Sequence, residues 1–144
     1  MAAKGSAVKT VTKRGNLIKV SWLLTSDASG DADENGSGAS GFFYGAAYGK
    51  IKHFEIHPDG VAAPDADADY YVKDANGLDL LFGAGVDCGA GTHYRKGILA
   101  TTGVTNSGQD VVLFNDTLMV IGDEMGNAKK CTVVLVIERT PDLY

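Results

Sequence analysis

Histidine and glutamate side chains in the segment GKIKHFEIHP are the first that could do chemistry. His53, Glu55 and His57 occupy every second position, so a β-strand would place them on one face together with Ile51. Imidazole and carboxylate groups are ligands for zinc, and the third histidine, His93, would have to come near to complete such a site. His93 is distant in sequence, and we expect the histidines to lie on a half-exposed strand face without forming a metal centre.

A second candidate is a run of oxygen-bearing side chains. The segment DADENG at residues 31–36 matches the opening of a calcium-binding loop, where hard oxygen ligands alternate and glycine allows a sharp turn. Asp31, Asp33 and Asn35 would be the ligands. The position at which such a loop closes with a bidentate glutamate holds Phe42. We therefore favour a solvated acidic turn and expect no bound metal.

Signatures of catalysis are missing from the sequence. No serine or cysteine lies in a nucleophile-elbow motif, and no carboxylate pair stands out from the general excess of aspartate. We predict that the protein is not an enzyme and takes no cofactor. Cys88 and Cys131 are too few and too far apart for a disulfide framework or a metal motif. We expect Cys131 to pack inside an apolar strand and Cys88, which lies among glycines, to be exposed.

The overall composition limits the partners. The chain has 144 residues, which suits one domain, and its net charge of -5 argues against nucleic acid, which needs clustered cations. The one mild basic cluster, formed by Lys9, Lys13, Arg14 and Lys19, would face either an acidic partner surface or solvent. No apolar run reaches membrane-spanning length and no secretory signal is present, so we expect no membrane partner and synthesis in a reducing cytoplasm.

Alternation of side-chain type with a period of two predicts strands along most of the chain. One regular strand is expected at residues 17–25, with Trp22 on its core face. Another is expected at residues 128–139, where both faces are apolar, as in a central strand or in a strand covered by a partner. Further strands are expected at residues 7–12, 49–57, 70–74, 78–82, 98–104, 111–114 and 118–121.

Turn residues separate these strands. Asn76 and Gly77 accept positive φ and are expected to close a tight hairpin. No stretch has a helical period, so the sequence predicts an all-β fold: a single antiparallel β-sandwich or barrel with long Gly/Asp-rich loops. This one domain would span residues 1–144, with an extended N-terminal arm at 1–6, an exposed acidic Gly/Ser loop at 26–41 and a C-terminal tail at 140–144.

A string of turn and strand residues in the second half of the chain carries a family resemblance. Its members are Pro64, Tyr70 or Tyr71, Asp74, Gly77, Asp79, Leu80, Leu81, Gly83 and Gly85. This string resembles a segment that recurs in small virion proteins of tailed bacteriophages. The resemblance implies a capsid decoration (cement) protein on the outer surface of the virion, which binds and stabilises the shell of major capsid protein. It implies a homo-oligomer, such as a trimer. The alternative is a tail, neck or fibre/spike component with a receptor- or glycan-binding β module.

Residues for an interface can be suggested beside that resemblance. Phe42, Phe43, Tyr44 and Tyr48 form an aromatic segment that could anchor a partner protein, and packing into the core is an equally good interpretation. Two basic residues near the N-terminus, Lys4 and Lys9, complete the set.

Overall fold

The computed structural model describes residues 5–33, 42–88, 94–97, 100–102, 105–109 and 111–139. These residues contain β-strands and no helix, which confirms the all-β prediction. The strands are β1 (Ser6–Arg14), β2 (Leu17–Thr25), β3 (Phe42–Pro58), β4 (Asp69–Lys73), β5 (Tyr94–Gly97), β6 (Ala100–Thr102), β7 (Thr105–Gln109), β8 (Val111–Asp123) and β9 (Lys130–Glu138).

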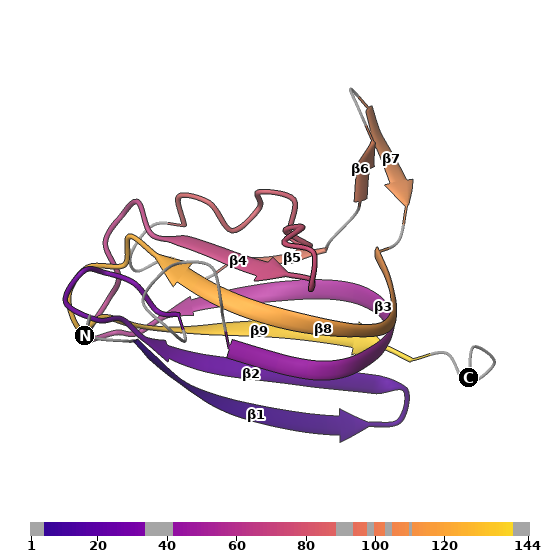
Figure 1. Cartoon of the computed structure of the whole chain (residues 1–144), viewed down its shortest axis with the longest axis horizontal. Coiled ribbons are helices and arrows are strands. Elements are labelled where there is room, and N and C mark those ends of the chain that lie inside the picture. The colour runs from indigo at the N-terminus through magenta and orange to yellow at the C-terminus, as the bar shows by residue number, and fades with distance from the viewer. Residues whose placement is uncertain are drawn as a thin grey trace.

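Seven of the described strands form one antiparallel sheet that curls into a nearly closed barrel (Figure 1). Their order is β1-β2-β9-β3-β8-β4, and β5 pairs with β3. Among the described strands, β6 and β7 pair with each other alone, and they stand away from this body. The last strand of the chain, β9, therefore lies between β2 and β3, and it is apolar on both faces because it is central.

The long strand β3 makes the curvature. Its first half pairs with β8, and its second half pairs with β9. The register shifts between Tyr44 and Ala47, and again before Gly49, as expected for bulges that bend a strand. Gly49 has a φ of 119° and passes the backbone of Glu138 so closely that a Cβ atom would overlap the Glu138 carbonyl oxygen. This glycine therefore lies where β3 leaves β9 and crosses to the other side of the barrel.

A further register shift in β3 corrects one sequence interpretation. Ile51 was expected on the same face as His53, but it pairs with Ile137 in the core, whereas His53 pairs with Val136 on the outer face. Lys52 is the extra residue at this irregularity. One inserted residue moves every later side chain to the opposite face, and a period of two read from the sequence cannot reveal it.

The core lies between the two sides of the barrel. Trp22, Phe54, Tyr70 and Leu135 are completely buried there. The burial of Trp22 and the packing of Cys131 in the core agree with the sequence analysis. Cys88 does not, because it is only 3 % exposed: its backbone N–H donates to Ala68, which holds it against the inner side of the fold.

Three predicted local structures differ from those observed. Residues 78–82 are not a strand after the Asn-Gly turn, because Asp79 accepts hydrogen bonds from Leu81 N and Gly83 N and holds a series of turns. Residues 111–114 and 118–121 belong to one strand, β8, in which Asn115 has a positive φ. Residues 105–108 have the sequence Thr-Asn-Ser-Gly, which is typical of a turn, but they belong to β7.

The first half of the predicted exposed loop is also different. Within residues 26–33, Ser26, Asp27 and Asp33 are buried, and Ala32 pairs with Gly122 of β8. Small side chains let this segment lie flat against its neighbours, so low apolar content did not mean exposure. The rest of that loop, the N-terminal arm up to residue 4 and the tail at 140–144 lie outside the described residues.

The two edge strands of the sheet, β4 and β1, differ in how far other segments cover them. The outer edge of β4 is covered by residues 79–88: Tyr70 N donates to Gly85 O at 2.8 Å, and Leu80 N donates to Val72 O at 2.7 Å. In the described part of the chain, β1 pairs with β2 alone. Eight of its nine residues are exposed, and Ala7 is half-buried. Among the described residues, β1 is therefore an edge strand without a cover, and natural proteins usually protect such edges.

Candidate interface between β1 and β3

An open seam runs along one side of the barrel, between β1 (Ser6–Arg14) and residues 42–48 of β3. Each of these two segments has one paired edge within the described structure, β1 with β2 and residues 42–48 with β8. Lys9 crosses the seam: its Nζ donates to Phe43 O at 3.1 Å and lies 5.8 Å from the centre of the Tyr44 ring. Because a side chain bridges the two segments instead of backbone hydrogen bonds, the barrel is open here.

The seam contains a cleft of about 350 Å³. Ile18 and Ile137 contribute apolar surface to it, and Tyr44 and Tyr48 contribute aromatic rings. Lys13 and Arg139 supply positive charge from β1 and from the end of β9. Such a cleft can bind an extended chain that carries apolar and acidic side chains.

The predicted aromatic interface residues lie along this seam. Phe43 is 42 % exposed, whereas Phe42 and Tyr44 are partly buried against the core. Tyr48 packs edge-to-face on Phe114, with ring centres 5.7 Å apart. The sequence allowed two roles for this segment, packing into the core and contact with a partner. Some of its rings pack against the core, and others reach the surface where a partner could contact them. Of the two predicted basic residues, Lys9 lies in the seam and Lys4 lies outside the described residues.

Sequence reasoning missed two parts of this site. Arg139 comes from the far end of the chain, and Phe114, which is 75 % exposed, comes from β8. Only the strand order brings these two residues to the seam. The basic cluster was visible in sequence: the hairpin of β1 and β2 carries Lys9, Lys13, Arg14 and Lys19 and has no acidic residue between Ser6 and Thr25.

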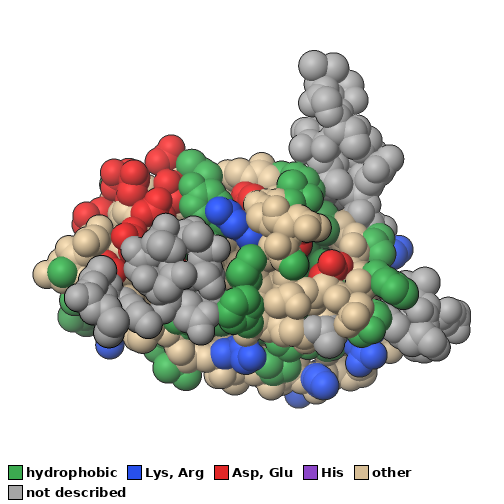
Figure 2. Space-filling model, viewed as in Figure 1, with side chains coloured by type: hydrophobic (Ala, Val, Ile, Leu, Met, Phe, Trp, Pro, Cys, Tyr) green, Lys and Arg blue, Asp and Glu red, His purple; other side chains and the backbone are tan. Residues whose placement is uncertain are grey.

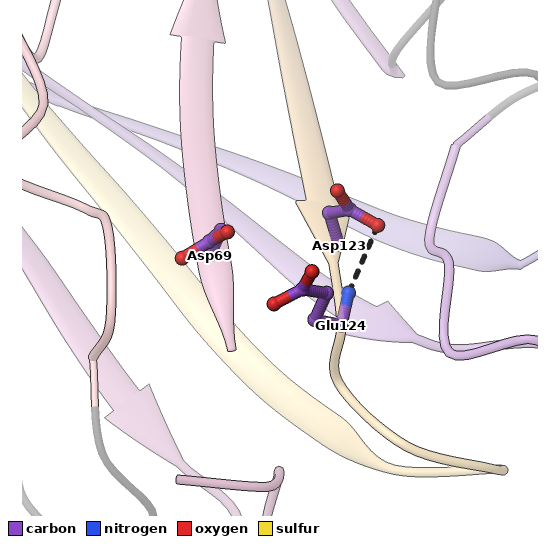
Figure 3. Close-up of side chains that lie close together, drawn as sticks. All are labelled: Asp69, Asp123 and Glu124. Carbon is purple, nitrogen blue, oxygen red and sulfur yellow. Dashed lines mark hydrogen bonds between the residues drawn. The ribbon is translucent and has the colours of Figure 1, made fainter. Parts of the chain in front are cut away.

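Acidic side chains gather at the opposite end of the molecule. Figure 2 shows carboxylates at one end of the visible face, while most of the visible Lys and Arg lie along the edge where Figure 1 places β1 and β2. Carboxylate oxygens of Asp69, Asp123 and Glu124 lie within 4.8 Å of one another (Figure 3). Asp69 and Asp123 are direct register partners on β4 and β8, an arrangement that places like charges opposite each other.

These carboxylates repel one another, and the pKa values of Glu124 and Asp31 are raised at this end of the molecule. Negative charge on Asp69 and Asp67 raises the pKa of Glu124. Hydrogen bonding to Asp123, with partial burial, raises the pKa of Asp31 to about 6.

Calcium prefers oxygen ligands such as carboxylates and takes six to eight of them. Asp69, Asp123 and Glu124 could offer three of these oxygens. Of the three calcium ligands predicted from the sequence, Asp31 lies beside Asp123 at the acidic end of the molecule. Asp33 is fully buried, and Asn35 lies outside the described residues.

The raised pKa of Asp31, which is hydrogen-bonded to Asp123, gives a testable pH dependence. The pKa of Asp31 is about 6 in the fold against 3.8 for the free side chain, so the folded state binds this proton more tightly. The free energy of unfolding should therefore fall as the pH rises from about 4 to about 6. Asp31→Asn keeps a hydrogen-bonding group and removes the charge. We expect it to raise the stability at pH 7 and to flatten this slope in urea titrations at several pH values. An unchanged slope would contradict the assignment.

The histidine row lies on the outer face of the sheet, as the sequence predicted for His53, Glu55 and His57. Glu55 is 5 % exposed, and its two oxygens lie 3.2 Å from His53 Nε2 and 2.9 Å from His57 Nε2. The carboxylate thus separates the two imidazoles. Among the described residues, only the three acidic groups of Figure 3 bring three potential ligand atoms within 4.8 Å, so this row does not converge on one ion. His93 lies outside the described residues.

Comparison with known proteins finds no matching family model, no matching curated protein and no matching solved structure. In the described part of the chain, no helix is long and apolar enough to cross a membrane.

Proposed function

We propose that this chain is a non-enzymatic structural protein of a tailed bacteriophage virion. Its role would be that of a decoration protein that binds the outer surface of the capsid and stabilises the shell of major capsid protein. The observation that carries the proposal is the open seam, where the uncovered strand β1 and the aromatic segment of β3 lie together. The family resemblance of residues 64–85 supports the same assignment.

The physical demands of a cement protein agree with this geometry. Such a protein must be stiff, because it holds neighbouring subunits in fixed positions, and a continuous antiparallel sheet with a fully packed core is stiff. It must also present apolar side chains to its partner. Val8 is 64 % exposed and Val11 is 38 % exposed, and both lie on β1, which has one neighbouring strand in the described structure.

Capsids assembled without this protein provide the direct test. The purified protein would be mixed with them, and the bound copies counted after sedimentation. We expect saturable binding with a fixed number of copies per capsid, and an increase in the temperature at which the shell breaks down. Absence of binding would exclude the decoration role.

Charge reversal in the seam should weaken that binding. The double change Lys9→Glu and Lys13→Glu replaces attraction to an acidic partner by repulsion, and we expect the affinity to fall by about tenfold or more. The double change Lys52→Glu and Lys130→Glu is the matched control, because it alters the net charge by the same amount at two exposed residues that do not line the cleft. Equal losses in both variants would mean that net charge, and not the seam, governs binding.

A glycan- or receptor-binding module of a tail fibre, spike or neck is the second candidate. The exposed rings of Phe43 and Phe114 favour it, because sugars stack on exposed aromatic faces. A glycan array separates the two roles: a specific signal that is lost in Phe114→Ala would support the fibre role.

A further inference from the structure

We infer that the open seam is a strand-addition site, which captures an extended segment of a partner protein with acidic side chains directly opposite Lys9 and Lys13. This inference deepens the proposed function by naming how the partner is held.

The backbone of β1 is ready to pair. β1 and β2 are joined by the two-residue loop Gly15-Asn16, and Gly15 has a φ of 58°, as in a type II′ turn. In such a hairpin the residues that flank the loop, Arg14 and Leu17, form a hydrogen-bonded pair, and these pairs alternate along the strands. The intervening residues of β1 therefore direct their N–H and C=O groups away from β2: Ala7, Lys9, Val11 and Lys13.

The side chains of those residues face the seam. Lys9, Val11 and Lys13 are register partners of Trp22, Val20 and Ile18, which lie on the core face of β2. An added strand would thus place three of its side chains directly opposite a cation, an apolar residue and a second cation. Cross-strand neighbours interact most strongly, so the complementary pattern is acidic, apolar, acidic at alternate positions.

The contrast between the two edges supports this use of β1. The edge of β4 is covered by residues 79–88, whereas β1 has no second strand in the described structure. Binding by strand addition takes its affinity from main-chain hydrogen bonds and its specificity from alternate side chains. β1 offers both, through its outward backbone groups and through the alternating side chains of Lys9, Val11 and Lys13.

Charge selects the occupant. If a second copy paired through its own β1, the cations Lys9, Lys13 and Arg14 of both copies would line the same edge, and like charges disfavour that arrangement. A partner segment that carries carboxylates has the opposite effect. We therefore assign the seam to an acidic segment of another protein and not to self-pairing of β1.

A short synthetic peptide tests the inference without capsids. The probe is Thr-Thr-Glu-Thr-Val-Thr-Glu-Thr-Thr, which has nine residues like β1 and the same side-chain pattern in either strand direction. We expect binding to the intact protein, measured by calorimetry and by slowed hydrogen exchange of β1 amides. The same peptide with lysine in place of both glutamates should bind about tenfold more weakly, since its charges repel the hairpin.

Backbone pairing has its own test. Val11→Pro removes one outward N–H from β1, a position where proline is tolerated at a sheet edge, whereas Val11→Ala keeps that N–H. We expect Val11→Pro to weaken peptide binding by about tenfold, the worth of one backbone hydrogen bond, and Val11→Ala to weaken it less. A probe with N-methylvaline at its centre should fail to bind the unaltered protein, which tests the same bond without any change in the fold.

The outcomes separate this inference from the proposed function. If the N-methylated probe binds as well as the original, strand addition is wrong. If the protein forms oligomers whose mass falls in Val11→Pro, the seam is occupied by a second copy, and the assignment to a partner segment is wrong. Binding of capsids that is undiminished by Val11→Pro would keep the decoration role and overturn the seam, whereas peptide binding without capsid binding would do the reverse.

Discussion

Replacing Gly49 by alanine should destabilise the protein by about 3 kcal/mol or more, because two costs combine at this position. The backbone has a φ of 119°, which residues with a side chain rarely adopt, and a Cβ atom would overlap the carbonyl oxygen of Glu138. The contact is with backbone at the end of β9, so no side chain can rotate away to make room. Urea denaturation followed by circular dichroism measures the change.

Gly45 is the matched control for this prediction. It lies four positions earlier on the same strand, has no positive φ, and a Cβ atom there would meet nothing within 4 Å. Gly45→Ala should therefore change the free energy of unfolding little, or raise it slightly by restricting the unfolded chain. If Gly49→Ala and Gly45→Ala behaved alike, β3 would not depend on a glycine where it crosses the barrel.

The sequence predicts a strand well when each face of that strand is either buried or exposed along its whole length. The alternation in residues 17–25 matches the bounds of β2, and its buried side is the one that contains Trp22. β9 was predicted as central because Val134 and Val136 add a second apolar face, and both are buried. In these two strands, side-chain type and burial vary together, so local reasoning succeeds.

The remaining features depend on contacts between distant segments. The register shift at Lys52 places Ile51 and His53 on opposite faces of the sheet, and the chemistry of the neighbouring residues does not indicate this shift. The buried position of Ala32 follows from its pairing with Gly122, about ninety residues away in the chain. Composition reports how much apolar surface a segment can bury, but it does not report which backbone lies beside it.

The candidate site shows the same division. Basic residues on the hairpin and aromatic residues at 42–48 could be identified from the sequence, because their chemical types are unusual in this acidic chain. Their convergence could not, because it requires β1 to be at one end of the strand order and β3 to cross back toward it. A strand with a bare edge and a strand with two neighbours have the same alternation, so an uncovered edge is visible only in the structure.

The arrangement of charge places a condition on any partner. The basic hairpin and the acidic end that holds Asp69, Asp123 and Glu124 lie apart, so the protein has a directional charge distribution despite its modest net charge of -5. An acidic partner would be attracted to the seam and repelled by the opposite end. Such a distribution sets the orientation of docking before close contacts form, and salt should weaken the encounter.

Replacing Trp22 by alanine should cost about 3–5 kcal/mol, which is a large part of the stability of a domain of this size. Trp22 is completely buried between Lys9 and Val133 in the register of the sheet, and its loss would leave a cavity that the surrounding strands cannot close. Leu23→Ala is the control, because Leu23 is the next residue on β2, points to the outer face and is 38 % exposed. We expect that change to cost about 1 kcal/mol or less. Thermal and urea denaturation of both variants, followed by circular dichroism, would measure the difference, and similar losses would contradict the assignment of the core to the face of β2 that carries Trp22.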